Sequence, residues 1–410
     1  MDADRDTRCG TRNGRTYRLL DERTAALHIA CYAAPAGASP AEHLAYGERV
    51  LRRLLAQGLP YVDGASGPEV DGDELLNFCR AVGDDAWRHG MVPEFRRMVG
   101  LYEPAMQRRS RGRFVLRHRR RWFFHDRPVG ASVRLSFALP IDDPARRTQA
   151  VEVTEPGGCR ASVSGEAVVL RGVVPAERFI DAEVRIEAEL DCEIPERGPS
   201  APEPGPWLAT DEPGIPCTDR VRALASEWTA GRDQPLEQIR AIWDELEARV
   251  RPGFLHPEDT EIDPIELGWA DCKTSSSLLV GMTRTLGIPA RLVSGMLLLR
   301  DRPSDFHFWM EAWLPDLGWA PFDWSATVAL AEVAEDREPW RSHFFGRLDY
   351  RLIYARYPQR LFGATGVQLP AGWYRSEHGA TGALVRQYRA ASDRRPIFTD
   401  TFEVEGVTWI

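Results

Sequence analysis

The sequence predicts a mixed α+β fold, and changes of residue pattern along its 410 residues support that class. Apolar residues recur at helical spacing near the N-terminus, alternate with polar residues in a central region, and return to helical spacing in the second half. Further alternating stretches follow the second set of predicted helices. Antiparallel strands that are grouped together, with helices before and after them in the chain, are typical of the α+β class.

The N-terminal region, residues 1–107, is expected to be helical behind a flexible lead of about 25 residues. Apolar residues between positions 40 and 102 form two stripes at helical spacing. The first stripe comprises Leu44, Val50, Leu51, Leu54 and Leu55, and the second comprises Leu75, Leu76, Cys79 and Val82. The stretch YVDGASGPEVDGDE between them is rich in residues that favour turns.

Residues 108–193 are expected to form a small antiparallel β-domain, with a sandwich as the simplest arrangement. From Val133 to Leu139, apolar residues occupy every second position, which is typical of a half-buried strand. Similar runs occur at 149–153, 161–170 and 182–190. The turn-forming stretches PIDDPARR and EPGG separate several of these runs.

A proline-rich segment, residues 194–217, is expected to be a semi-rigid linker to a further domain. That domain, residues 218–345, begins with two predicted helices, and Pro235 suits the first position of the second helix. Residues 346–410 follow as a C-terminal extension with short strands.

The composition argues against several classes of function. The net charge of −9 disfavours general nucleic-acid binding, because phosphates attract basic proteins. The seven cysteines include no CxxC pair, which disfavours a disulfide framework or a zinc site and favours a reducing cytoplasm. We expect neither a secretory signal nor a membrane span. No phosphate-binding loop, dinucleotide-binding glycine pattern, HExxH or EF-hand motif is present, so neither a cofactor nor a metal is expected.

The segment from Gly268 to Thr327 contains the residue types that thiol-based acyl transfer requires. Asp271 is suited to cap a helix that begins at Cys272 and ends before Gly287. The partial positive charge at the start of a helix favours the thiolate over the thiol. Backbone N–H groups of the same turn can donate to an oxyanion that forms on the acyl carbon.

A histidine and an aspartate follow on two predicted strands. His307 begins the alternating stretch HFWMEAWL, and Asp323 ends the short stretch GWAPFD. Adjacent antiparallel strands can bring the two side chains within hydrogen-bond distance, so that the carboxylate orients the imidazole and the other ring nitrogen faces Cys272. We predict Cys272 as the nucleophile, His307 as the base and acid, and Asp323 as the orienting residue. The alternatives are a buried structural cysteine, a strand histidine and a turn aspartate.

This segment resembles the active-site region of bacterial transglutaminase-like proteins. The resemblance rests on Asp271-Cys272-Lys273 followed by an apolar helix and LGIPARLVSG, and on HFWMEAWLPDLGWAPFDWSAT. It covers residues 219–355 and, weakly, 108–193. It implies a papain-like transglutaminase core, in which a cysteine-bearing helix packs on an antiparallel sheet that carries the histidine and the aspartate. The resulting fold is an α+β chain with this core after a small β-sandwich and an N-terminal helical region.

Four further residues are candidates for the acyl groove or the oxyanion site: Trp243, Trp269, Trp309 and Lys273. Eukaryotic relatives use a tryptophan indole to hold the oxyanion, and the resemblance makes Trp243 and Trp269 candidates for that role. Trp269 and Trp309 are equally well explained as core aromatic residues. Lys273, the only lysine of the chain, either adds a positive charge beside the nucleophile or is simply solvated.

Arg113, Arg117, Arg119 and Arg121 belong to the arginine-rich run RRSRGRFVLRHRRR. The plainest interpretation is a strand with a solvated basic face whose arginine stems pack on the sheet. The alternative is a docking surface for an acidic partner such as an acyl-carrier protein. Nucleic acid is a weaker candidate, because the chain as a whole is acidic.

Three functional hypotheses follow. The first is an enzyme that forms an acyl-Cys272 intermediate and transfers the acyl group to an amine, with a glutamine amide or a carrier-protein thioester as donor, as in the amide synthases of specialised metabolism that it resembles. The second is a cysteine peptidase or amidase that uses the same triad with water as acceptor. The third is a protein-binding module without catalytic activity.

Overall fold

The computed structural model describes residues 7–12, 15–33, 39–81, 99, 111–124, 127–143, 145–164, 167–191, 207–212, 214–253, 263–299, 302–332, 334–346, 351–356, 374–378, 384–388 and 397–410. The chain forms two compact units. The first unit comprises residues 1–100, 243–275 and 325–341, and the second comprises residues 101–242, 276–324 and 342–410. Helices combine with mainly antiparallel sheets in the described part, which confirms the α+β class.

In the first unit, the N-terminal part is a small sheet with helices. Its strands are β1 (Thr7–Arg12), β2 (Arg15–Leu20), β3 (Val62–Gly64) and β4 (Gly67–Asp71), in the order β1-β2-β4-β3. Its helices are α1 (Glu22–Ala33), α2 (Pro40–Ala56) and α3 (Gly72–Ala81). Leu51 and Leu54 of the first predicted stripe and Leu75 of the second lie in one buried cluster. Both stripes therefore face a common core, as amphipathic helices do.

The expected flexible lead is a β-hairpin in the structure. β1 and β2 pair from Thr7↔Leu20 to Arg12↔Arg15, and α1 begins two residues after β2. The dipeptide Asn13-Gly14 between the strands is a strong hairpin signal in sequence. The stretch predicted as a turn between the helices likewise forms the hairpin of β3 and β4. The N-terminal region is thus mixed in structure rather than purely helical.

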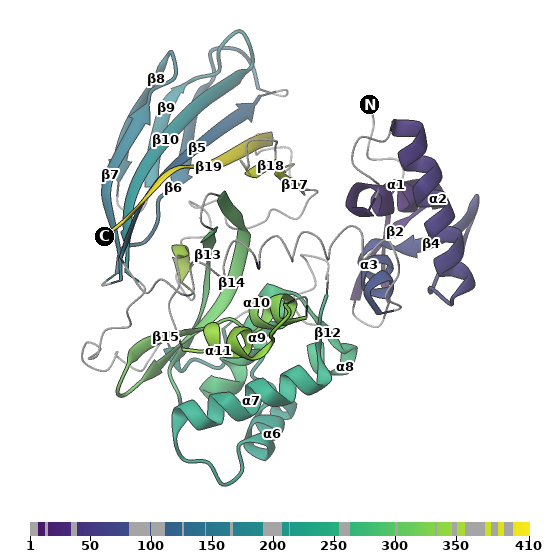
Figure 1. Ribbon diagram of the computed structural model, residues 1–410. Helices are drawn as coiled ribbons and strands as arrows, with labels where there is room; N and C mark the ends of the chain where they lie inside the picture. The colour runs from purple at the N-terminus through teal and green to yellow at the C-terminus, as the bar shows by residue number, and fades with distance from the viewer. Residues whose placement is uncertain are drawn as a thin grey trace. The chain divides into compact units, whose positions relative to one another are not determined.

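In the second unit, two antiparallel sheets form the predicted β-sandwich (Figure 1). One sheet has the order β17-β18-β19-β5-β10-β7, and the other has the order β6-β9-β8. The strands are β5 (Gly112–Phe123), β6 (Ser132–Ala138), β7 (Arg146–Thr154), β8 (Cys159–Ser164), β9 (Ala167–Val173), β10 (Phe179–Leu190), β17 (Tyr374–His378), β18 (Leu384–Tyr388) and β19 (Ile397–Trp409). Leu116 and Val184 of the first sheet share a buried cluster with Leu135 and Leu170 of the second.

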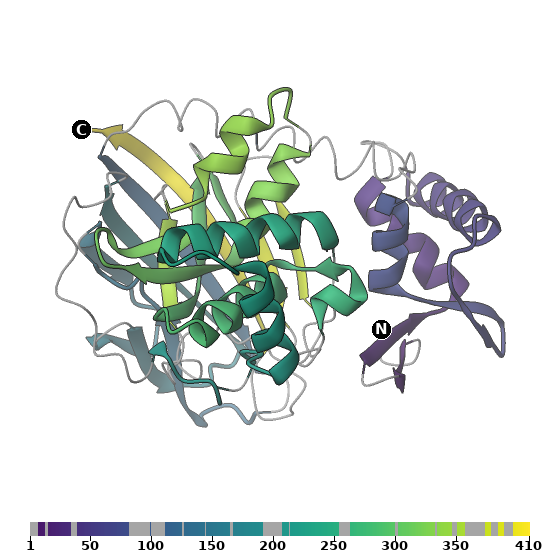
Figure 2. The ribbon, with the colours of Figure 1, turned by 90° about the horizontal axis from the view of Figure 1, so that it is seen from below.

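The last strand of the chain, β19, lies inside the larger sheet, between β18 and β5. It pairs with β5 from Ile397↔Phe123 to Trp409↔Gly112, and Figure 2 shows this yellow strand alongside the blue β5. Residues 346–410 were expected to form an extension of their own. Residues 397–409 instead belong to the sandwich. They pair with the edge of β5 that faces away from β10, and so satisfy backbone groups that an edge strand would leave unpaired.

The part of the chain from residue 218 to residue 356, called the core, contains helices and a second antiparallel sheet. Its helices are α6 (Asp219–Trp228), α7 (Pro235–Arg249), α8 (Pro264–Leu267), α9 (Cys272–Thr285), α10 (Trp324–Ala331) and α11 (Glu338–His343). Its strands are β13 (Ala290–Leu299), β14 (Arg302–Leu314), β15 (Gly318–Phe322) and β16 (Arg351–Arg356), in the order β15-β14-β13-β16, with β11 (Arg251–Pro252) and β12 (Trp269–Ala270) as a short parallel pair.

Within the second unit, helix α9 packs on this sheet through polar as well as apolar contacts. The hydroxyl of Ser276 donates to the carbonyl oxygen of Phe308 at 3.2 Å, and the hydroxyl of Thr283 lies 3.4 Å from the sulfur of Met310. A helix on an antiparallel sheet is the arrangement that the resemblance implied. Met296 of β13 also belongs to the buried cluster of the sandwich, so the sheet of the core and the sandwich share apolar packing.

The described half of the predicted linker packs on the core. Trp207 lies edge-to-face against Trp319, with ring centroids 5.4 Å apart. The buried guanidinium of Arg284 donates to the carbonyl oxygen of Ala209 and to the carboxylate of Glu212, at 2.8 and 2.6 Å. A buried arginine needs such partners, so these residues of the predicted linker contribute to the packing around Arg284.

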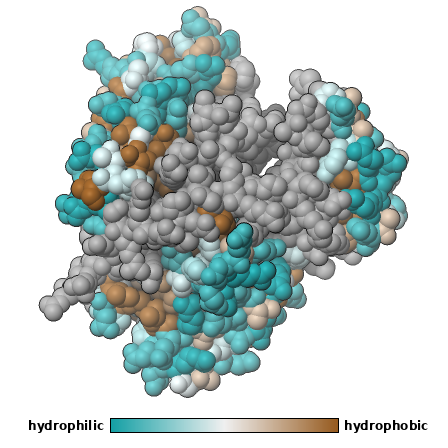
Figure 3. Space-filling model, in the orientation of Figure 1, coloured by the Kyte–Doolittle hydropathy of each residue, from teal (hydrophilic) through white to brown (hydrophobic). Residues whose placement is uncertain are grey.

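The face shown in Figure 3 is mainly hydrophilic over its described residues, with hydrophobic residues in separate small groups. Val129, Val163 and Val173 are among the exposed apolar side chains. None of the described helices is both long and apolar enough to cross a membrane.

Candidate active site

The predicted histidine and aspartate are in contact. Nε2 of His307 lies 2.9 Å from Oδ1 and 2.8 Å from Oδ2 of Asp323. The pairing of β14 with β15 produces this contact, since it aligns Met310 with Phe322 and so brings the strand of His307 beside the residue that follows β15. The Asp323 side chain is 1% exposed and that of His307 is 15% exposed, so only the imidazole retains access to solvent.

The tautomer of His307 follows from this contact. An ionised carboxylate only accepts hydrogen bonds, so Nε2 carries the proton that lies between His307 and Asp323. In the neutral ring, Nδ1 is then the basic nitrogen. The backbone supports the carboxylate as well, because the N–H of Asp323 donates to the carbonyl oxygen of Phe344 at 3.1 Å.

A third group, which the sequence analysis did not single out, contacts the same carboxylate. Nη1 of Arg351 donates to Oδ2 of Asp323 at 2.6 Å, and both side chains are 1% exposed. Arg351 is the first residue of β16, which joins the sheet by pairing with β13. The spacing between Asp323 and Arg351 in sequence carries no signal of this contact, because it depends on the order of the strands in the sheet.

Cys272 is the first residue of α9, as predicted, and is half-buried. Asp271 caps the helix: its Oδ1 accepts hydrogen bonds from the backbone N–H of Thr274 at 2.7 Å and from the hydroxyl of Thr274 at 2.6 Å. Burial raises the pKa of Asp271, whereas the hydrogen bonds from Thr274 and the positive charge of Lys273 act in the opposite direction.

The cap limits which amides of α9 can serve as oxyanion donors. The N–H groups of Lys273 and Thr274 donate to the carboxylate of Asp271, and the N–H of Ser275 donates to the carbonyl oxygen of Asp271. The sequence predicted that several N–H groups of this turn could donate to an oxyanion. Of the first N–H groups of α9, only that of Cys272 itself is left for this role. Cys272 belongs to the first unit and His307 to the second, and their pairing stays a prediction.

The tryptophan candidates lie in different surroundings. Trp243 and Trp309 are completely buried, and Trp309 packs in a cluster with Ile141, Val293 and Ile353. Trp269 is half-buried on β12. The burial of Trp243 and Trp309 indicates core packing, which was the alternative interpretation for Trp309.

Lys273, the last of these candidates, is half-buried in the first turn of α9. Its positive charge acts on the neighbouring Asp271 carboxylate. A role of Lys273, Trp243 or Trp269 toward the thiol or an oxyanion stays a prediction.

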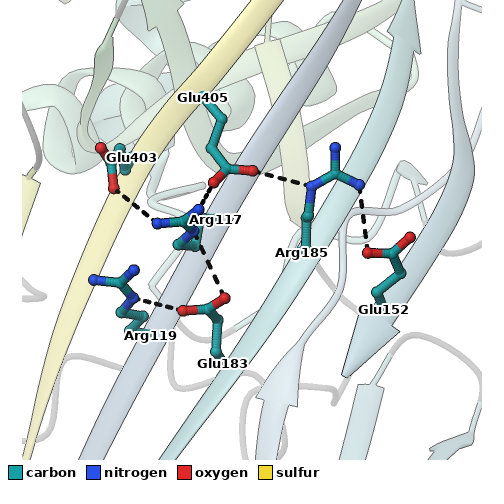
Figure 4. A network of polar contacts seen from close by, with 7 residues as sticks. All are labelled: Arg117, Arg119, Glu152, Glu183, Arg185, Glu403 and Glu405. Carbon is teal, nitrogen blue, oxygen red and sulfur yellow. Dashed lines mark hydrogen bonds and ion pairs between the residues drawn. The ribbon is translucent and has the colours of Figure 1, made fainter. Parts of the chain in front are cut away.

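The four arginine candidates of β5 point outward and pair with carboxylates of neighbouring strands. Arg117 contacts Glu183 of β10 and both Glu403 and Glu405 of β19, and Arg119 also contacts Glu183 (Figure 4). Arg113 pairs with Glu187 and Glu189, and Arg121 with Asp181. The predicted solvated face is therefore a ladder of ion pairs. Its positive charges have carboxylate partners within the chain, and docking of an acidic partner at this face stays a prediction.

The described residues contain no group of three or more His, Cys, Asp or Glu side chains placed to hold a metal ion. Cys79, Cys159, Cys217 and Cys272 have free thiols. Burial raises the pKa of Cys159 and of Cys217, as desolvation of a thiol does.

Comparison with known proteins gives a family match at this site. Residues 222–324 match the model of the transglutaminase-like superfamily. This segment includes the cysteine, the histidine and the aspartate that the sequence analysis selected. It ends before β16, so Arg351 lies outside it.

Two curated proteins are similar to this chain. The first is a protein-glutamine gamma-glutamyltransferase of Pseudomonas aeruginosa, 27% identical over 133 residues, which are 29% of this chain and 20% of the relative. The second is the uncharacterized protein YebA of Bacillus subtilis, 26% identical over 126 residues, or 26% of this chain and 17% of the relative. The chain thus spans at most about a fifth of the length of these relatives.

Two solved structures are also similar. One is a candidate cysteine protease from Cytophaga hutchinsonii, with a TM-score of 0.41 and 14% identity over 73% of this chain and 91% of the other. Another is the periplasmic domain of TgpA from Pseudomonas aeruginosa, with a TM-score of 0.31 and 17% identity over 59% and 95% of the two chains. Because both TM-scores are low, the family assignment rests on the sequence match.

Proposed function

Since residues 222–324 form a transglutaminase-like domain, we propose that this chain is a cysteine-dependent acyltransferase. In this proposal Cys272 forms the acyl intermediate, His307 transfers protons, and a primary amine accepts the acyl group. The observation that carries the proposal is the contact of His307 Nε2 with the buried carboxylate of Asp323. One side of the imidazole contacts a buried carboxylate, and the ring is still accessible to solvent. This combination is typical of a catalytic histidine.

The position of the cysteine supports the same proposal. Cys272 begins α9, and Ser276, one turn further along this helix, donates to the carbonyl oxygen of Phe308. Phe308 is the neighbour of His307 in β14. The part of α9 that belongs to the second unit is therefore attached by a buried hydrogen bond to the strand that carries the proposed base.

The proposed reaction has two balanced steps. First, Nδ1 of His307 takes the thiol proton, the sulfur of Cys272 attacks the acyl carbon, and the leaving group departs with that proton as the carbon–leaving group bond breaks. A thioester of Cys272 results. Second, an amine attacks the thioester, His307 accepts a proton from the nitrogen, and the carbon–sulfur bond breaks to give the amide and the free thiol. Asp323 stabilises the imidazolium in both steps without taking its proton.

The acyl donor is proposed to be a glutamine side-chain amide or a carrier-protein thioester, in keeping with a role in biosynthesis. The Pseudomonas relative is named as a protein-glutamine gamma-glutamyltransferase, which supports the glutamine amide. Water in place of the amine would make the same triad a peptidase or amidase. The choice depends on how well the site excludes water when an amine is bound. We retain a cytoplasmic location as part of this proposal.

The test uses p-nitrophenyl acetate as an activated acyl donor with the full-length chain. Intact-mass analysis should detect one acetyl group on the wild type and none on Cys272→Ala. Addition of a primary amine such as cadaverine should divert the acetyl group into the amide in preference to acetate. An acetyl-enzyme whose product is acetate at every amine concentration would establish the hydrolase, and absence of the acetyl-enzyme would refute the proposed function.

A further inference from the structure

Arg351 lies behind the proposed triad, at the carboxylate that orients the histidine. Its Nη1 is 2.6 Å from Oδ2 of Asp323, the oxygen that is also 2.8 Å from Nε2 of His307. One buried carboxylate is thus shared between an imidazole and a guanidinium. A carboxylate has enough lone pairs to accept both.

Arg351 is held in this place by contacts of its guanidinium and of its backbone. Its Cζ lies 4.8 Å from the ring centroid of Trp309 and 5.1 Å from that of Phe344, distances at which a cation is attracted to an aromatic ring. The carbonyl oxygen of Arg351 accepts a hydrogen bond from Nε of Arg146 at 3.0 Å. Trp309 thus packs against the guanidinium of Arg351, which is a different role from lining the acyl groove.

The burial of Arg351 needs an explanation, because apolar residues of similar volume usually serve stability as well as a buried ion pair does. An arginine does not lose its proton in a protein, so the positive charge is permanent. A permanent positive charge beside Asp323 favours the ionised carboxylate and fixes its rotamer. It also offsets part of the negative field that Asp323 exerts on the imidazole.

We propose that Arg351 is a positioning residue that keeps Asp323 ionised and turned toward Nε2 of His307, so that Nδ1 is available as the base. The inference rests on the proposed function. It also extends the catalytic machinery beyond residues 222–324, since β16 begins after that segment and β13 connects it to β14. The site is incomplete without this strand.

The chain offers a matched control on the same strand. Arg356, the last residue of β16, is also buried and ion-paired, but with Asp143 and Glu311 rather than with Asp323. Arg351→Met and Arg356→Met therefore remove the same charge from two buried positions of the same strand. A general loss of packing would affect both variants, whereas positioning of Asp323 involves only the first.

The measured quantity is the rate of acetylation of Cys272 by p-nitrophenyl acetate in full-length variants, as a function of pH. Arg351→Met should slow acetylation about 10²-fold, as misplacement of a catalytic group does, and Arg351→Lys should restore part of the rate. Arg356→Met should stay within about twofold of the wild type. The limb of the pH profile that reports the loss of the proton from His307 should move to higher pH in Arg351→Met, because the uncompensated charge of Asp323 favours the protonated imidazole.

A double-mutant cycle separates positioning from folding. If Arg351 acts through Asp323, the variant Asp323→Asn/Arg351→Met should be no slower than Asp323→Asn, and it avoids an unpaired buried charge should Arg351→Met fail to fold. Additive losses in the cycle, or equal losses in Arg351→Met and Arg356→Met, would overturn the inference. A wild type that is not acetylated at Cys272 would instead refute the proposed function.

Discussion

At the scale of single residues, a second buried ion cluster lies in the sandwich. Oδ1 of Asp400 is 2.9 Å from Nε2 of His118, and both oxygens of Asp400 accept hydrogen bonds from Arg120, at 2.5 and 2.6 Å. Burial lowers the pKa of His118, although Asp400 acts in the opposite direction. Burial alone would raise the pKa of Asp400, but Arg120 and His118 together lower it.

This cluster predicts how stability depends on pH. The folded-state pKa of His118 lies below its unfolded value of about 6.5, so its contribution is complete above that pH and is lost as the pH falls below it. Asp400 adds a further loss only below about pH 3.9, its unfolded value. The melting temperature should therefore fall between about pH 6.5 and 5, because His118 gains a proton in the unfolded chain at a higher pH than in the folded one.

The variant His118→Gln tests this assignment. It should be less stable than the wild type at neutral pH. Its melting temperature should also change less between about pH 6.5, the pKa of an unfolded histidine, and about pH 5. Differential scanning calorimetry over this range measures both effects. Parallel curves for the two proteins would exclude His118 as the group responsible.

The residues of the candidate site were predictable to different degrees. His307 lies within β14 and Asp323 directly follows β15, the next strand, and the pairing of consecutive strands is common enough to predict their contact. Arg351 lies on β16, at the opposite edge of the sheet from β15. The side-chain pattern of a strand does not predict the position of that strand in a sheet. The contact between Arg351 and Asp323 was therefore not predictable from the sequence alone.

At the scale of elements, the start of α9 depends on the cap that Asp271 provides. Its carboxylate accepts both the amide and the hydroxyl of Thr274. Asparagine caps a helix about as well as aspartate does, whereas alanine does not cap. Because burial already disfavours the charge of Asp271, loss of that charge should cost little.

We therefore expect Asp271→Ala to lower the free energy of unfolding by about 1 kcal/mol, and Asp271→Asn to lower it by only a few tenths. Urea unfolding followed by tryptophan fluorescence measures the difference. Asp263→Ala is a matched control, because Asp263 caps α8 through the amides of Ile265 and Glu266. Equal losses in Asp271→Ala and Asp271→Asn would show that the charge, rather than the cap, matters.

The alternation of β5 shows what the sequence pattern does establish. Arg113, Arg117, Arg119 and Arg121 point to one side, while His118 and Arg120 point into the sandwich. The period of two predicted the first set as an exposed face. It did not predict that two basic side chains would be buried on the other face, because their partner Asp400 comes from the last strand of the chain.

At the scale of the whole molecule, β19 lies between β18 and β5 in the larger sheet of the sandwich. It supplies Asp400 to the buried cluster and Phe402 to the core, and the ring of Phe402 stacks on that of His118 with centroids 4.0 Å apart. The contribution of β19 to the second unit is therefore both apolar and electrostatic.

Phe402→Ala should lower the free energy of unfolding by about 3–5 kcal/mol, because it leaves a cavity in a completely buried position. Glu403→Gln, the neighbouring position on the outer face, removes only an ion pair with Arg117 and should cost at most about 1 kcal/mol. Thermal unfolding of the two variants measures the contrast. A loss of free energy of unfolding in Phe402→Ala as small as that in Glu403→Gln would mean that the sandwich does not depend on the packing of β19.

The central claim is that His307 activates Cys272 as a nucleophile, and the reactivity of Cys272 toward iodoacetamide tests this most directly. Cys217 serves as an internal reference in the same chain, since burial raises the pKa of its thiol. At neutral pH, peptide mass spectrometry should show Cys272 alkylated about 10²-fold faster than Cys217, and His307→Ala should remove that advantage. Alkylation of the two cysteines at similar rates, or a Cys272 rate that His307→Ala leaves unchanged, would contradict the account.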